Sequence, residues 1–145
     1  MTTLRSDAWL LRGISAIPGE LALGSAELSF TASGAGSAWP FQLRRLARQL
    51  GQPAAETLAD VNPVRLFAWP VREIRCAAPW FFFGGGLTLE RRGTRLRVGF
   101  GEPVGARRDP GAALGGLRRI GAMRALGQQW ETTLRQASQH GETGP

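Results

Sequence analysis

The stretch APWFFFGGGLTLERRGTRLRVGF, residues 78–100, decides the fold because its second half alternates between apolar and polar side chains. A period of two residues is typical of a strand with one buried face, and two such runs meet at Arg92-Gly93. We therefore expect an antiparallel hairpin that places Glu90 beside arginine on its outer face. The inward set would be Leu87, Leu89, Leu96, Val98 and Phe100.

The glycine run Gly84–Gly86 raises the question of a phosphate-binding loop. Such a loop needs a strand, then glycines, then the N-terminus of a helix that faces the anion. Here the glycines lead into a hairpin, and no Lys-Ser or Lys-Thr pair follows them. We interpret them as structural, with at least one in a bulge or at positive φ, so that the sheet can bend over a core supplied by residues 80–83.

Upstream of this stretch the chain also reads as strands. Residues 8–32 show alternating apolar positions, interrupted by Pro18-Gly19 and again by Gly24-Ser25, which predicts a turn at each. The segments VRLFAW, VREIRCA and PWFFFG between residues 64 and 84 predict three further short strands.

Residues 33–63 interrupt these strands and look like a helical insertion. SGAGSA has the composition of a flexible linker, and WPFQLRRLARQL then repeats its apolar residues with helical period, starting at Pro40 and ending at Gly51. If the helix is structural, its leucines cover the chain's own strands, which is the interpretation we favour. If it is functional, it is an interfacial helix or a ligand for a partner's groove. The candidate residues for that role are Trp39, Phe41, Arg44, Arg45 and Arg48.

A second amphipathic helix is predicted at about residues 117–138. Asp109-Pro110 supplies an N-cap signal ahead of it, and residues 139–145 should form a frayed tail. We expect Trp130 to insert over one open end of the sheet. The apolar stripe consists of Met123, Leu126, Trp130, Leu134 and Ala137.

These elements predict one mainly β domain over residues 1–145. Its expected architecture is a curled antiparallel sheet or barrel capped by the C-terminal amphipathic helix, with the insertion at 33–63. The order resembles the pleckstrin-homology superfold, and within it the GRAM-like branch. The stretches that carry the resemblance are GELALGSAELSF, FAWPVREIRCAAPWFFFGGGLTLERRGTRLRVGF and MRALGQQWETTL.

The resemblance implies a non-catalytic module that binds a protein partner or an anionic lipid head group. Pleckstrin-like domains often hold phosphoinositides between their first two strands, through basic residues in that loop. Here the loop matched to it is AIPGEL, which contains Glu20 and no arginine. That lipid site is therefore not carried over to this chain.

Charge gives the remaining candidate surface. The net charge is +7, and all 18 basic residues are arginine, a bias typical of a GC-rich genome. A hairpin tip and a helix start could join as one anionic-ligand patch, or these charges could simply be solvated. The patch would contain Arg91, Arg92, Arg95, Arg97, Arg107, Arg108, Arg118 and Arg119.

The inventory of catalytic groups is thin. His140 is the one histidine and Cys76 the one cysteine, so neither a zinc site nor an internal disulfide is expected. We predict no enzymatic activity and no cofactor. The N-terminus lacks a signal-peptide pattern and no apolar run approaches the ~20 residues of a membrane span, so we predict a cytoplasmic protein without a transmembrane segment. Three hypotheses stay open: protein binding, anionic membrane binding and, least supported, nucleic-acid binding.

Overall fold

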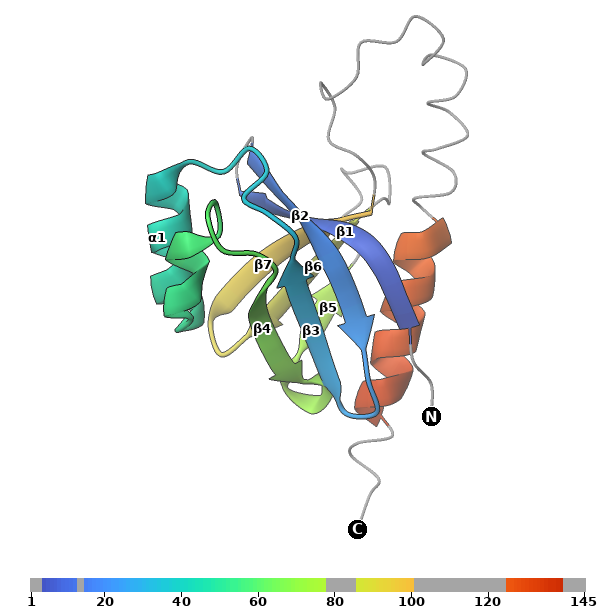
Figure 1. Ribbon diagram of the computed structural model, residues 1–145. Coiled ribbons are helices and arrows are strands. Elements are labelled where there is room, and N and C mark those ends of the chain that lie inside the picture. Colours follow the sequence, from blue (N-terminus) through green and yellow to red (C-terminus); the bar gives the residue numbers. More distant parts are fainter. Residues whose placement is uncertain (1–3, 13–14, 78–85, 101–124, 140–145) are drawn as a thin grey trace, which may run out of the picture.

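The computed structural model describes residues 4–12, 15–77, 86–100 and 125–139, and its main element is a seven-stranded antiparallel sheet. The strand order is β4-β3-β2-β1-β7-β6-β5, and the sheet curls strongly so that β1–β4 lie across from β5–β7 (Figure 1). The strands are β1 (Leu4–Arg12), β2 (Ser15–Leu23), β3 (Glu27–Ala32), β4 (Val64–Pro70), β5 (Arg75–Ala77), β6 (Gly86–Arg91) and β7 (Thr94–Gly99).

The sheet is not a closed barrel, which corrects part of the predicted architecture. Within the described strands, β4 and β5 each pair on one side and form the two edges. The 3-10 turn η2 (Val71–Glu73) joins the two edge strands directly at one corner. The side chain of Gln52, which lies between α1 and the following 3-10 helix, donates a hydrogen bond to the Arg65 carbonyl of β4 at 3.0 Å, so the insertion contacts this edge strand.

The β6–β7 hairpin matches its predicted register. Leu87 lies opposite Val98 and Leu89 opposite Leu96, and all four are buried, while Arg95 is exposed. The turn falls at Arg92 (φ 48°) and Gly93 (φ 84°), where glycine relieves the left-handed strain. The inward residues of the other strands complete one continuous core, which includes Leu10, Ile17, Leu21, Leu28, Phe30 and Phe67.

One turn prediction was wrong, and one strand prediction was confirmed only in part. Pro18-Gly19 does not turn the chain but lies within β2, where Pro18 pairs with Trp9 of β1. The β2–β3 ladder ends at Gly19, so the missing N–H of Pro18 breaks no pairing with β3. The segment VREIRCA is divided between η2 and the short strand β5. The predicted turn after Leu23 is confirmed, with the Gly24 amide donating to the Glu27 carbonyl at 2.9 Å.

Gly86 is the part of the glycine run that the structure describes, and it begins a strand. A Cβ at this position would lie 2.8 Å from the Val98 carbonyl oxygen across the hairpin, so close backbone approach explains a glycine here. Its φ is not positive. Gly84, Gly85 and the predicted strand at 79–84 lie outside the described residues.

The C-terminal helix covers one end of the sheet through Trp130. Residues 125–139 are helical, and Trp130 and Leu134 are buried as predicted. The indole is fully buried, stacks on Phe100 at 6.0 Å between ring centroids and donates a hydrogen bond from Nε1 to Ser6 Oγ at 2.9 Å. Gln139, expected in the frayed tail, is still helical. The predicted helix start at 117, Asp109-Pro110, Met123 and the tail from 140 lie outside the described residues.

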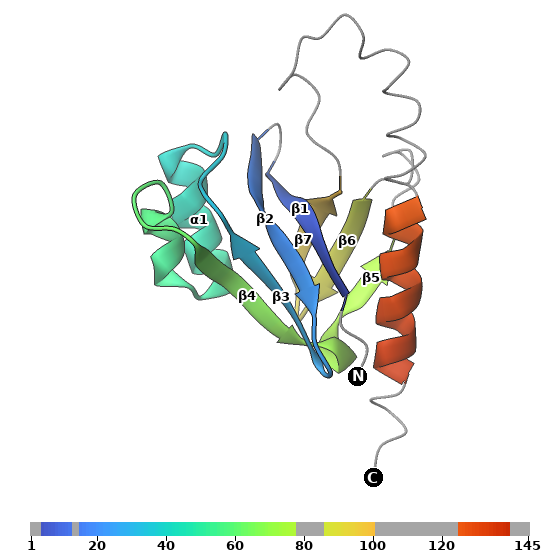
Figure 2. The same ribbon diagram turned by 45° about the vertical axis from the view of Figure 1, so that its right-hand side comes forward.

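The insertion lies at the opposite end of the sheet from this helix (Figure 2). Its helix α1 (Pro40–Leu50) has the predicted bounds, with Gly51 as a left-handed C-cap at φ 64°. The side chain of Gln42 accepts a hydrogen bond from the Trp39 amide at 2.8 Å, which stabilises the start of the helix. A 3-10 helix, η1 (Pro53–Thr57), follows.

The SGAGSA segment is not a free linker. Its Ser33 and Ser37 amides donate to the carbonyls of Pro18 and Ala16 at 2.9 and 3.1 Å, and the Ala16 amide donates to Ser37 Oγ at 2.9 Å. These bonds continue the pairing of β2 beyond the end of β3. Gly36 has φ 57°, and a Cβ there would collide with the Ala16 carbonyl oxygen. Backbone pairing that composition does not reveal therefore holds the start of the insertion on the sheet.

Candidate functional site

The described half of the predicted anionic patch is the β6–β7 hairpin, and acidic partners occupy most of it. Arg92 Nη2 lies 2.6 Å from Glu73 Oε1, and Arg91 Nη2 lies 3.3 Å from Glu73 Oε2. Arg95 pairs with Glu90 at 3.2 Å, as the cross-strand pattern predicted. Arg97 is exposed and lies opposite Thr88.

Arg91 has a structural role in this hairpin. Its guanidinium lies 5.9 Å from the centroid of the Trp69 ring, and Trp69 in turn packs on Phe67 at 4.5 Å. The Arg91 side chain is only 24% exposed, so most of it is unavailable to a ligand. Together with Glu73 on η2, it ties the hairpin to the end of the edge strand β4.

Glu73 is a residue of this surface that the sequence analysis did not single out. Partial burial opposes its ionisation, but the guanidiniums of Arg91 and Arg92 outweigh that effect, so the pKa of Glu73 lies below its ordinary value of 4.5. Glu73 lies two residues before Arg75, which is paired with Glu90, so the antiparallel register of β5 and β6 brings Glu73 beside Arg91 and Arg92. The sequence around Glu73 does not reveal this strand pairing. The remaining candidates Arg107, Arg108, Arg118 and Arg119 lie outside the described residues.

The second candidate surface is the outer face of α1. Helical geometry of about 100° per residue separates two faces. The inner face carries Leu43, Leu46 and Ala47, all buried in the core, with Leu50 partly buried beside them. This confirms that the helix is structural on its apolar side. The outer face carries Phe41, Arg44, Arg45 and Arg48, all exposed.

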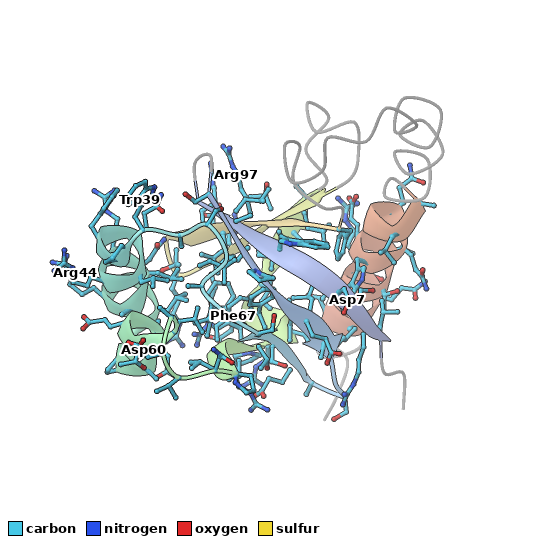
Figure 3. All side chains as sticks on the ribbon, turned by 45° about the horizontal axis from the view of Figure 1, so that its top comes forward. Asp7, Trp39, Arg44, Asp60, Phe67 and Arg97 are labelled. Carbon is cyan, nitrogen blue, oxygen red and sulfur yellow. The ribbon has the colours of Figure 1, made fainter. Side chains whose placement is uncertain are left out.

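The aromatic residues at the start of α1 are unusually open to solvent. Trp39 is 61% exposed and Phe41 57%, and with Val61 they are the large hydrophobic side chains left exposed in the described parts of the chain. All three belong to the insertion. Figure 3 shows Trp39 and Arg44 on the side of the molecule opposite Asp7, with Asp60 at the far end of the insertion.

The arginines of α1 differ from those of the hairpin because no described acid pairs with them. The helix contains no acidic residue, and the ion pairs found in the described ranges join other arginines to Glu20, Glu73, Glu90 and Glu131. The outer face of α1 therefore carries three exposed arginines on the C-terminal side of an exposed phenyl ring. We call the set Trp39, Phe41, Arg44, Arg45 and Arg48 the α1 outer face.

The described residues offer little for catalysis. Within residues 4–12, 15–77, 86–100 and 125–139, no cluster of three or more His, Cys, Asp or Glu side chains could hold a metal ion. Cys76 is half-buried on β5, and burial, reinforced by the carboxylate of Glu131, raises the pKa of its thiol although Arg135 opposes this. A raised pKa keeps the thiol protonated and weakly nucleophilic at neutral pH.

No protein-family model matches the chain, and neither a curated protein nor a solved structure matches it. In the described parts of the chain, none of the helices has the length and apolar character that crossing a membrane requires.

Proposed function

We propose that this protein is a non-catalytic interaction module of pleckstrin-homology-like fold, of the GRAM-like branch, and that it binds a protein partner through the α1 outer face. The fold assignment is supported by a strongly curled antiparallel sheet with a C-terminal helix whose tryptophan covers one end. The insertion at 33–63 remains its departure from that family and is also where the candidate surface lies.

The observation that carries the binding proposal is the exposure of Trp39 and Phe41 beside unpaired arginines. A Phe or Trp side chain buries roughly 150–250 Å² in a contact, so covering the exposed part of Phe41 removes about 100 Å² of apolar surface from water. At about 25 cal/mol per Å² this favours association by roughly 2–3 kcal/mol before entropic costs. Aromatic residues and arginine are also the types enriched at the centres of protein interfaces.

Binding to an anionic membrane is the alternative, and the geometry supports it less well. An interfacial helix places its apolar face in the lipid, but Leu43 and Leu46 of α1 are already in the core. Three hairpin arginines that could add charge, Arg91, Arg92 and Arg95, are paired with Glu73 or Glu90. Nucleic-acid binding has weaker support, because exposed Glu56 and Asp60 follow α1 in the same insertion and would repel phosphates.

A surface variant tests the proposal directly. Affinity capture with the wild-type chain is compared with Trp39→Ala/Phe41→Ala and with a control, Arg65→Gln/Arg72→Gln, at exposed positions outside α1. We expect a protein that the wild type and control retain and the α1 variant loses. Binding must then be reproduced with the two purified proteins, with a Kd raised about tenfold or more in the α1 variant. Equal binding by the α1 variant, or binding to vesicles alone, would overturn the proposal.

A further inference from the structure

We infer that the α1 outer face recognises an acidic peptide segment that carries a large apolar side chain at one end of a short row of carboxylates. This inference rests on the proposed function and adds the chemistry of the partner. Its basis is the arrangement of charge and apolar surface on one face of one helix.

The positions on α1 set the geometry of the ligand. Relative to Phe41, Arg44 and Arg45 stand three and four residues along and Arg48 stands seven, so all share a face with the phenyl ring. Side chains at these spacings are neighbours, with Cβ atoms about 5–6 Å apart over each turn. A ligand that covers Phe41 with an apolar group therefore meets guanidiniums on the C-terminal side of that contact.

The positive charge of this face favours a ligand that carries carboxylates. The exposed guanidiniums of Arg44, Arg45 and Arg48 have no acidic partner among the described residues, whereas Arg5, Arg91, Arg92, Arg95 and Arg135 each have one. A guanidinium presents two parallel N–H donors that match the fork of a carboxylate. Acidic side chains spaced by about one helical turn would pair with this row without disturbing the fold.

Two features favour a discrete peptide over an extended polyanion. The basic face is short, because Glu56 and Asp60 are exposed shortly after the helix ends. A nucleic-acid strand or a charged bilayer would carry phosphates past these carboxylates, whereas a peptide can place its own charges selectively. The exposed ring of Phe41 at the N-terminal end of the row also requires an apolar contact that a phosphate backbone does not supply.

The test is a displayed library of random 16-residue peptides, selected on the wild-type chain and counter-selected on Trp39→Ala/Phe41→Ala. We expect the survivors to contain a Leu, Phe or Trp with Asp or Glu residues clustered on one side of it. A synthetic survivor should bind about tenfold or more weakly after Glu→Gln replacement, and equally weakly to Arg44→Gln/Arg45→Gln/Arg48→Gln. The control Arg65→Gln/Arg72→Gln/Arg75→Gln removes the same charge outside α1 and should bind normally.

The outcomes separate this inference from the proposed function. Survivors that lack acidic enrichment, or that bind the α1 arginine variant and the control equally, overturn the acidic-partner inference while leaving protein binding in place. A selection that yields no peptide discriminating wild type from the Trp39→Ala/Phe41→Ala variant overturns both. Tight binding of a single-stranded oligonucleotide or of phosphatidylserine vesicles through the same arginines, without peptide binding, also overturns both and assigns the face to phosphate ligands.

Discussion

Trp130→Ala should remove the contact by which the C-terminal helix covers the end of the sheet. The indole is fully buried. Its ring and its N–H group connect the helix to two different parts of the sheet. The ring stacks on Phe100 just after β7, with an interplanar angle of 13°, and Nε1 donates to Ser6 Oγ on β1. Truncation to alanine leaves a large cavity and deletes both contacts.

The magnitude follows from these parts. Large aromatic truncations in cores cost roughly 3–5 kcal/mol of the free energy of unfolding. Within that total, the aromatic stack with Phe100 accounts for about 0.5–1.5 kcal/mol and the hydrogen bond to Ser6 for a similar amount. Trp130→Phe, which keeps a ring but loses the donor, should therefore cost about 1–2 kcal/mol. Ser6→Ala should cost less in the Trp130→Phe background than in the wild type.

Urea melts followed by far-UV circular dichroism measure these differences, with the slope m as a check that each variant still unfolds in two states. The order should be wild type, Trp130→Phe, then Trp130→Ala. A loss below about 1 kcal/mol for Trp130→Ala would show that the helix does not stabilise the core. Equal losses for the phenylalanine and alanine variants would show that the hydrogen bond, rather than ring burial, carries the contact.

Three further predictions concern other parts of the fold. Leu46→Asp buries an unpaired charge and should lower the free energy of unfolding, measured in a urea melt, by about 3 kcal/mol or more. Phe41→Ala, on the outer side of the same helix, should lower it by less than about 0.5 kcal/mol. Equal losses would contradict the assignment of the two faces. Gly36→Ala should lower the free energy of unfolding by about 2 kcal/mol or more, because Gly36 has a positive φ and its new Cβ would meet the Ala16 carbonyl. Gly34→Ala is the control that should be tolerated in thermal melts, since its new Cβ has no atom within 4 Å. The folded-state pKa of Glu73 is lowered, so its contribution to the free energy of unfolding is complete above the ordinary value of 4.5 and is lost as pH falls through the folded value. The difference in stability between wild type and Glu73→Gln should therefore disappear on acidification. A difference that does not depend on pH would refute the ion-pair account.

Local chemistry in the sequence was enough to predict several elements. The β6–β7 hairpin, its turn at Arg92-Gly93, the bounds of α1 and the burial of Trp130 all follow from a period of two or 3.6 residues with the right turn or cap residue beside it. Such signals depend only on residues within a few positions of each other, so they can be interpreted without knowing where the rest of the chain lies.

Contacts between distant segments decided the remainder. Composition alone could not show that Pro18-Gly19 sits inside a strand or that SGAGSA pairs with β2, because both depend on where β3 ends. The sheet stays open because, among the described strands, β4 and β5 do not pair with each other although η2 joins them.

The candidate surfaces show the same division most clearly. The sequence by itself determined that the chain has arginines on a hairpin and on an amphipathic helix. Only the tertiary structure decided that Glu73 pairs with Arg91 and Arg92 of the first group, while the second group stays exposed beside Phe41. The physical reason is that an ion pair or an exposed ring depends on which segments strand pairing and packing bring together. These segments are far apart in the sequence, so no local pattern reveals the contact.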